Sequence, residues 1–115
     1  MSRNLFDLTG RVVLAAEANS GIGLGFLKGC ARQGADVVVW GRRADRNEEA
    51  LKQLSAAGAG RVHHEAVDVA DEQAVIDAFA ATLKAMGRVD CLFANAGFSD
   101  RAPSFPDIDR NDQPE

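Results

Sequence analysis

Hydrophobic residues fall into four short runs along the chain, separated by stretches of mixed polarity. The runs cover residues 12–16, 37–40, 62–67 and 89–94. The second and fourth runs are almost continuous in Val, Leu, Phe and Trp, which is typical of strands covered on both faces of a parallel sheet. Strands that alternate with helices predict right-handed βαβ crossovers, and therefore an α/β fold with an open parallel sheet.

Apolar residues between the runs recur at the spacing of helices. A first stripe after the first run consists of Ile22, Phe26, Leu27 and Cys30. A stripe after the third run consists of Val75, Ile76, Phe79, Leu83 and Met86. The helix between them, at about residues 45–57, is weaker and has Leu51 and Leu54 as its main apolar anchors. Glycines stand where these helices should end, at positions 34, 58, 60 and 87.

The chain has the length and composition of a single globular domain. It has 115 residues, of which 46% are hydrophobic and 26% charged, so one core is expected. The helix and strand pattern stops at residue 98, after which Pro103, Pro106 and Pro114 lie among Asp, Asn and Ser. We therefore expect a half domain over residues 1–97 and a loop or disordered acidic tail over residues 98–115.

The charge pattern bears on possible partners and location. The formal net charge is −4, and residues 100–115 contribute −3 of it, which leaves no clustered basic face for nucleic acid. The sequence has no apolar run of about 18 residues and its first ten residues lack the pattern of a signal peptide. We therefore expect a cytoplasmic protein with neither a membrane nor a nucleic acid as partner.

Cysteine and histidine give no indication of a metal site. Cys30 and Cys91 lack the CxxC spacing and are interpreted as small buried hydrophobic residues. His63 and His64 are adjacent on a predicted strand, so their side chains point to opposite faces and cannot bind one metal together.

The turn after the first strand is rich in glycine and leads directly into a helix. Gly21 and Gly23 leave no side chain between the backbone and a ligand, and the free N–H groups of a first helical turn attract anions. Asn19 or Ser20 can cap the helix. The pattern predicts a pyrophosphate site, and the alternative is a tight connection without a ligand.

The end of the second strand carries arginines where a dinucleotide-binding unit often has an acid for the ribose 2′-hydroxyl. The residues there are Gly41, Arg42 and Arg43. Because a guanidinium group suits a 2′-phosphate, they favour NADP(H) over NAD(H). Alternatively, these arginines form a solvated charge cluster that pairs with Asp45 or Glu48.

Two further groups follow the third and fourth strands. Asp68, followed by Val69, could accept a hydrogen bond from an adenine amino group, although an acid at this place is also typical of a turn or a cap. After the fourth strand, the amide of Asn95 could tie strand ends together, and the small residues Ala96 and Gly97 leave room for a cofactor.

Taken together, these elements resemble the short-chain dehydrogenase/reductase family. The family's Thr-Gly-x-x-x-Gly-x-Gly turn corresponds to residues 16–23, its Asn-Asn-Ala-Gly element to residues 94–97 and its Asp-Val pair to residues 68–69. The resemblance covers residues 8–109. It implies a Rossmann-like, partial doubly wound parallel sheet of about four strands in the order 3-2-1-4, an NAD(P) cofactor, and hydride exchange between an alcohol and a carbonyl. The candidate cofactor-binding residues are Asn19, Ser20, Gly21, Ile22, Gly23, Arg42, Arg43, Asp68, Val69, Asn95, Ala96 and Gly97.

The sequence departs from the family pattern in the glycine-rich turn. Glu17 replaces the first glycine and Ala16 replaces the threonine. A carboxylate about 4 Å from a phosphate is repelled by roughly 4 kcal/mol at an effective dielectric constant of about 20. We therefore expect weakened binding of NADP, unless the side chain of Glu17 points outward.

A second departure concerns proton transfer. The family uses a Tyr, a Lys a few residues later and a Ser, but this sequence contains no tyrosine, and Lys28, Lys52 and Lys84 belong to the predicted helices. We expect an N-terminal fragment or remnant of such an enzyme, with no catalytic residues and no activity by itself. Residues 89–94 would then form an exposed apolar edge able to pair with a related chain.

Two other interpretations remain open. The chain could be a pseudoenzyme module that retains nucleotide binding or docks onto a related chain. It could also become active when another polypeptide supplies the Tyr and Lys.

Overall fold

Each hydrophobic run that predicted a strand forms one in the computed structural model, which describes residues 6–94. The elements in chain order are β1 (Val12–Ala16), α1 (Gly21–Arg32), β2 (Asp36–Gly41), α2 (Ala44–Ala57), β3 (Val62–Ala66), α3 (Glu72–Met86) and β4 (Cys91–Ala94). The strands form one parallel sheet in the order β3-β2-β1-β4. The predicted fold class and strand order are therefore confirmed. Asn95, Ala96, Gly97 and the predicted tail lie outside the described residues.

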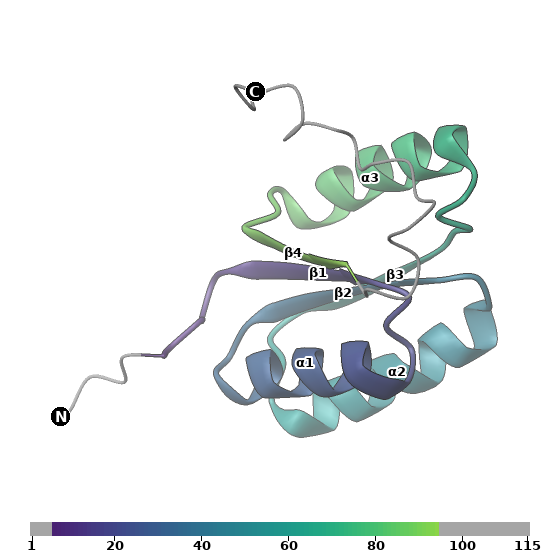
Figure 1. Ribbon diagram of the computed structural model, residues 1–115. Coiled ribbons are helices and arrows are strands. Elements are labelled where there is room, and N and C mark those ends of the chain that lie inside the picture. The colour runs from purple at the N-terminus through teal and green to yellow at the C-terminus, as the bar shows by residue number, and fades with distance from the viewer. Residues whose placement is uncertain (1–5, 95–115) are drawn as a thin grey trace, which may run out of the picture.

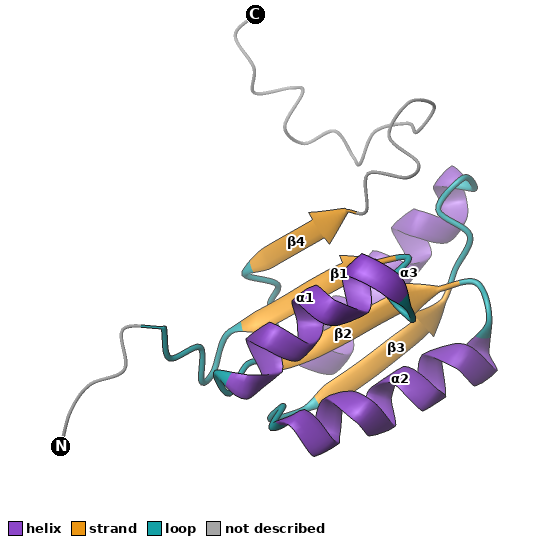
Figure 2. Ribbon diagram, turned by 60° about the horizontal axis from the view of Figure 1, so that its bottom comes forward, coloured by secondary structure: helices purple, strands orange, loops and turns teal. Residues whose placement is uncertain are grey.

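The sheet is the middle layer of three. Helices α1 and α2 cover one face and α3 covers the other (Figures 1 and 2). Every residue of β1 and β2 is buried, because side chains alternate between two covered faces. Val13 and Ala15 face the core under α1 and α2, whereas Val12 and Leu14 face the core under α3.

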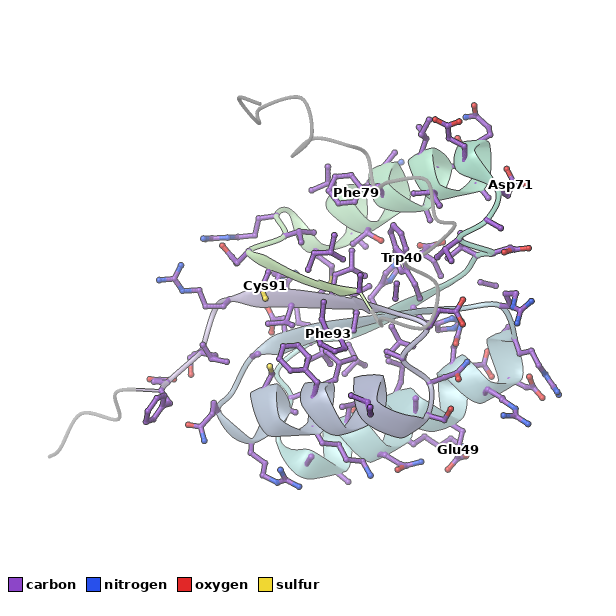
Figure 3. All side chains as sticks on the ribbon, viewed as in Figure 1. Trp40, Glu49, Asp71, Phe79, Cys91 and Phe93 are labelled. Carbon is purple, nitrogen blue, oxygen red and sulfur yellow. The ribbon has the colours of Figure 1, made fainter. Side chains whose placement is uncertain are left out.

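Helix α3 buries only part of its predicted apolar stripe. Three residues of the stripe, Ile76, Phe79 and Leu83, are 52%, 37% and 39% exposed. Among the described residues α3 is the only helix on this face, and nothing covers its outer flank. The helix is held by the buried side chains of Val75, Ala78 and Met86. A polar contact adds to them, because the indole Nε1 of Trp40 donates a buried hydrogen bond of 3.1 Å to Thr82 Oγ1. Trp40 lies between the sheet and α3 (Figure 3).

Two further apolar residues are exposed because of their positions, and for Cys91 the predicted burial is wrong. Ile22 is 74% exposed, because it lies in the first turn of α1, past the end of β1. Cys91 is exposed, because β4 is an end strand of the described sheet, whereas Cys30 is buried as predicted. Phe93 packs inward, and its ring stacks on Phe26 of α1 with centroids 4.5 Å apart (Figure 3).

The amino ends of the strands are joined by two aspartates. Asp36 Oδ1 accepts from the backbone N–H of Arg61 at 2.7 Å, and its Oδ2 accepts from the guanidinium Nε at 3.0 Å. The same guanidinium group donates to the carbonyl of Met86, which ends α3. Asp90 Oδ2 accepts from the N–H of Val12 at 2.8 Å. These contacts connect β1, β2, β3, α3 and the segment before β4.

Helix ends agree with the predicted glycines. Gly58 and Gly87 follow α2 and α3 with φ of 117° and 88°, the left-handed conformation expected of a residue just past a helix. In the part of the chain that the structure describes, no helix is long and apolar enough to span a bilayer.

Candidate functional site

The glycine-rich turn lies at the carboxyl ends of β1 and β2. The N–H groups of Glu17 and Ala18 both donate to the carbonyl of Trp40, at 2.7 and 3.3 Å, which fastens the turn to the end of β2. Ala18 is fully buried, and a Cβ at Gly23 would lie 2.9 Å from the Cα of Ala18. Glycine at position 23 is therefore required for α1 to start this close to the strand.

The first turn of α1 keeps its backbone donors free. Ser20 occupies the N-cap position with an extended backbone, but its side chain makes no capping bond. The N–H of Leu24 reaches the Ser20 carbonyl at 3.4 Å, while those of Gly21, Ile22 and Gly23 have no partner among residues 6–94. Three free donors at the positive end of a helix dipole can bind an anion. The prediction that Asn19 or Ser20 caps the helix is wrong.

The side chain of Asn19 bonds instead to Asn47, a residue that sequence reasoning missed. Asn47 is fully buried on α2, and its Oδ1 accepts from Asn19 Nδ2 at 3.0 Å. Its own Nδ2 donates to the carbonyls of Gly41 at 3.0 Å and Glu65 at 3.2 Å. Asn47 thus connects the ends of β2 and β3 to the turn after β1. The sequence contains one signal for this role. Asn47 has the helical spacing of the buried residues Ala50 and Leu54, so a polar residue stands where an apolar one is expected.

Glu17 has an unfavourable backbone conformation for a residue with a side chain. Its φ is 59°, and among the described residues it is the only non-glycine residue with a positive φ. Its side chain is half-buried and forms no hydrogen bond or ion pair with the described residues. The turn that leads to the free N–H groups therefore contains backbone strain and a carboxylate without a partner among the described residues.

The two arginines after β2 differ in their contacts. Arg43 pairs with Asp45 through Nε at 3.2 Å and Nη2 at 2.9 Å, which is the charge cluster considered as the alternative. The hydrogen bond from Arg43 lowers the pKa of Asp45. Arg42 is exposed and has no ion pair within residues 6–94. Of the two, Arg42 is the guanidinium group available to a ligand.

The remaining predicted residues are partly accounted for. Asp68 Oδ1 accepts from the N–H of Ala70 at 2.9 Å, as an acid in a turn does, and Val69 is half-buried. The residues predicted after β4, 95–97, lie outside the described part of the chain. Ala94, which precedes them, pairs with Ala16 at the end of β1.

The adjacent histidines of β3 have different partners. His63 Nε2 lies 2.7 Å from Glu65 Oε2, and His64 Nε2 lies 3.9 Å from Glu48 Oε2 of α2. Their separate contacts follow the alternation of side chains along a strand. Within residues 6–94, His, Cys, Asp and Glu side chains form no group of three or more that could hold a metal ion.

Known proteins share both the sequence pattern and the fold. Residues 11–113 match the family model described as short chain dehydrogenase. The chain is 43% identical over 100 residues to gluconate 5-dehydrogenase of Gluconobacter oxydans, covering 87% of this chain and 39% of that enzyme.

Solved structures agree with this match. A metagenomic short-chain oxidoreductase in complex with NADP gives a TM-score of 0.69 at 29% identity, covering 75% of this chain and 38% of that one. NAD+-bound xylitol dehydrogenase gives a TM-score of 0.70 at 25% identity, covering 74% of this chain and 32% of that one. The chain therefore spans well under half the length of these relatives.

Proposed function

The chain belongs to the short-chain dehydrogenase/reductase family, and from this premise we propose that it binds NADP(H) in preference to NAD(H) and does not transfer hydride by itself. Family membership alone leaves the choice of cofactor open, because one similar structure holds NADP and another NAD+. Residues of this chain itself favour NADP(H).

One observation carries the proposal. Three free backbone N–H groups at the start of α1 lie at the same end of the sheet as the unpaired Arg42. This is because β1 and β2 are parallel, with Ala16 and Trp40 as register partners near their carboxyl ends. The N–H groups of residues 21–23 would bind the pyrophosphate, and Arg42 would bind the 2′-phosphate. A reduced nicotinamide cofactor held there would be the source of a hydride.

The other predicted residues complete the proposed site. Asp68 keeps one carboxylate oxygen outside its bond to Ala70, and this oxygen would accept from the adenine amino group. Asn95, Ala96 and Gly97 would form the floor of the site. Glu17 opposes binding, because its carboxylate stands in the turn that would surround the pyrophosphate.

The proposed lack of activity concerns the proton that must accompany the hydride. Reduction of a carbonyl needs an acid at its oxygen, a contribution on the order of 100-fold to 10,000-fold. The 115-residue sequence contains no tyrosine, and its lysines lie on α1, α2 and α3 at positions 28, 52 and 84. We propose that this polypeptide binds the cofactor but supplies no group for proton transfer.

Calorimetric titration of the purified chain with NADPH and NADH tests the proposal. We expect NADPH to bind at least about tenfold more tightly, a difference of about 1.4 kcal/mol. Arg42→Ala should abolish the difference, while Arg46→Ala, which removes another exposed arginine on α2, should preserve it. Absence of saturable binding at millimolar cofactor would overturn the binding proposal. Oxidation of NADPH by the chain and a carbonyl compound would overturn its inactivity.

A second function, docking to a related chain, is supported by the surface beside β4. Among the described strands β4 pairs only with β1, and Leu92 of β4 is 43% exposed. We propose that a chain of the same family, including a second copy of this one, adds to this edge.

Sedimentation of the chain over a range of concentrations tests the docking surface. Wild type should associate as the concentration rises, and Leu92→Lys should remain monomeric. Ile22→Lys, at the exposed start of α1, is the matched control and should associate like wild type. A wild-type chain that stays monomeric throughout would overturn the pairing of two copies of this chain.

A further inference from the structure

The space beside Gly41 is filled by two amide side chains. A Cβ at Gly41 would lie 2.5 Å from Asn19 Nδ2 and 2.5 Å from Asn47 Oδ1, closer than real Cβ contacts come. These two atoms form the 3.0 Å hydrogen bond that joins the residues. Position 41 is therefore glycine because the Asn19–Asn47 amide bridge occupies the volume that a side chain would need.

The bridge is held firmly on one side and is open on the other. Asn47 is fully buried, both of its N–H groups reach carbonyls, and its Oδ1 accepts from Asn19. Asn19 is half-buried and uses one N–H in the bridge, so its second N–H and its carbonyl oxygen have no partner among the described residues. A neutral amide group is thus fixed at the carboxyl end of β2, beside Gly41, the residue that precedes Arg42 in the chain.

We propose that the Asn19–Asn47 amide bridge determines specificity at the ribose end of the cofactor site. The bridge fills the space in which a carboxylate side chain at position 41 would accept a hydrogen bond from the ribose 2′-hydroxyl. Because the bridge is neutral, it does not repel a 2′-phosphate that binds to Arg42. This inference rests on the proposed function, because it concerns how the proposed NADP site discriminates. In it, Asn47 is a positioning residue that acts through Asn19.

Two small probes isolate this end of the site. Adenosine 2′,5′-bisphosphate and 5′-AMP share the adenine, the ribose and a 5′-phosphate, so the repulsion from Glu17 affects both and cancels in the ratio of their dissociation constants. Wild type should bind the bisphosphate at least about tenfold more tightly. Asn19→Ala should lower that ratio about threefold, and Asn19→Asp, which introduces a carboxylate there, should lower it further.

Thermal unfolding provides a readout of the bridge without any ligand. Gly41→Ala should lower the melting temperature clearly in the wild-type background. The same substitution should have little effect when Asn19→Ala and Asn47→Ala have removed both amides, because the added Cβ then meets open space. Gln73→Ala is the matched control, because it removes an exposed hydrogen bond from the Gln73 amide to Asp77 on α3. It should change neither the melting temperature nor the ratio of the two dissociation constants.

The outcomes separate this inference from the function on which it rests. If wild type binds neither probe nor NADPH, the proposed function fails and the inference fails with it. If wild type discriminates between the probes but both Asn19 variants keep its ratio, the inference alone is overturned. An equal loss of melting temperature from Gly41→Ala in the two backgrounds would also overturn it.

Discussion

The two ends of the sheet are built from different kinds of interaction. At the amino end, Asp36 and Asp90 accept charge-assisted hydrogen bonds that connect neighbouring strands. At the carboxyl end, the neutral Asn19–Asn47 hydrogen bond joins the turn after β1 to α2, and Glu17 has a left-handed backbone. Three N–H groups of α1 there have no partner among the described residues. The amino end is arranged to stabilise the fold, and the carboxyl end keeps donors for a ligand.

This difference has a thermodynamic reason. A backbone donor that is buried without a partner costs free energy, and of residues 21–23 Gly23 is buried. A non-glycine residue at positive φ also costs free energy. Ion pairs that cross-link strands at the opposite end help to offset both costs. In open α/β sheets ligands bind outside the carboxyl ends of the strands, which is where this chain concentrates its unpaired groups.

The largest change in the free energy of unfolding is expected from removing the hydrogen bonds of Asp36 at the amino end of the sheet. Asp36→Ala removes the acceptor of two hydrogen bonds from Arg61, and the carboxylate it removes is nearly buried. We expect the free energy of unfolding, measured by urea denaturation, to fall by about 2–3 kcal/mol. Asp77→Ala, an exposed acid on α3, should cost under about 0.5 kcal/mol. A similar small loss for Asp36→Ala would contradict the assigned role of the amino end.

At the carboxyl end, Glu17→Gly should improve both binding and stability. The change removes a carboxylate near the proposed pyrophosphate and relieves a backbone strain of about 1–2 kcal/mol. We expect NADPH affinity measured by calorimetry to rise about tenfold or more. Glu17→Ala keeps the Cβ and therefore the strain, so it should gain affinity without gaining stability. Unchanged affinity in both variants would show that the carboxylate does not oppose binding.

The starts of two helices at the carboxyl end offer a finer comparison. Asp71 caps α3 by accepting from the N–H of Ala74 at 3.1 Å, so Asp71→Ala should cost about 1 kcal/mol. Ser20 makes no such bond at the start of α1, so Ser20→Ala should change the free energy of unfolding by less than about 0.5 kcal/mol. Thermal and urea unfolding measure both. An equal loss of unfolding free energy in the two variants would contradict the absence of a side-chain cap at the start of α1.

The smallest effect is expected in the pH dependence of the unfolding free energy, through Asp90 at the amino end of the sheet. The hydrogen bond from Arg88 lowers the pKa of Asp90, so the folded chain binds this proton less readily than the unfolded chain. The resulting stability is present above the unfolded carboxyl pKa, about 3.9, and is lost as the pH falls through the lower native pKa. Asp90→Asn should therefore flatten the acid side of the stability profile. A profile that keeps the wild-type slope would contradict this contribution.

Local sequence signals predicted the elements well. The run at residues 12–16 became β1 with the same bounds, and the alternation of strands and helices predicted the parallel sheet. Burial was predicted less well, because it depends on neighbours. Ile76 and Leu83 have the spacing of a core stripe, yet nothing in the described part of the chain covers the flank of α3 where they lie. Cys91 is exposed for a similar reason, on an end strand.

The sequence by itself determined the order of strands and helices, the glycine-rich turn with its unusual Glu17, and the arginines after β2, because these depend on periodicity and on residue types close together in the chain. Only the tertiary structure decided how those residues are used. It joined Asn19 to Asn47, 28 positions away, paired Arg43 and left Arg42 free, and left the first N–H groups of α1 without a cap. Each of these contacts depends on which side chains lie close together at the ends of separate strands, and no local sequence pattern specifies that proximity.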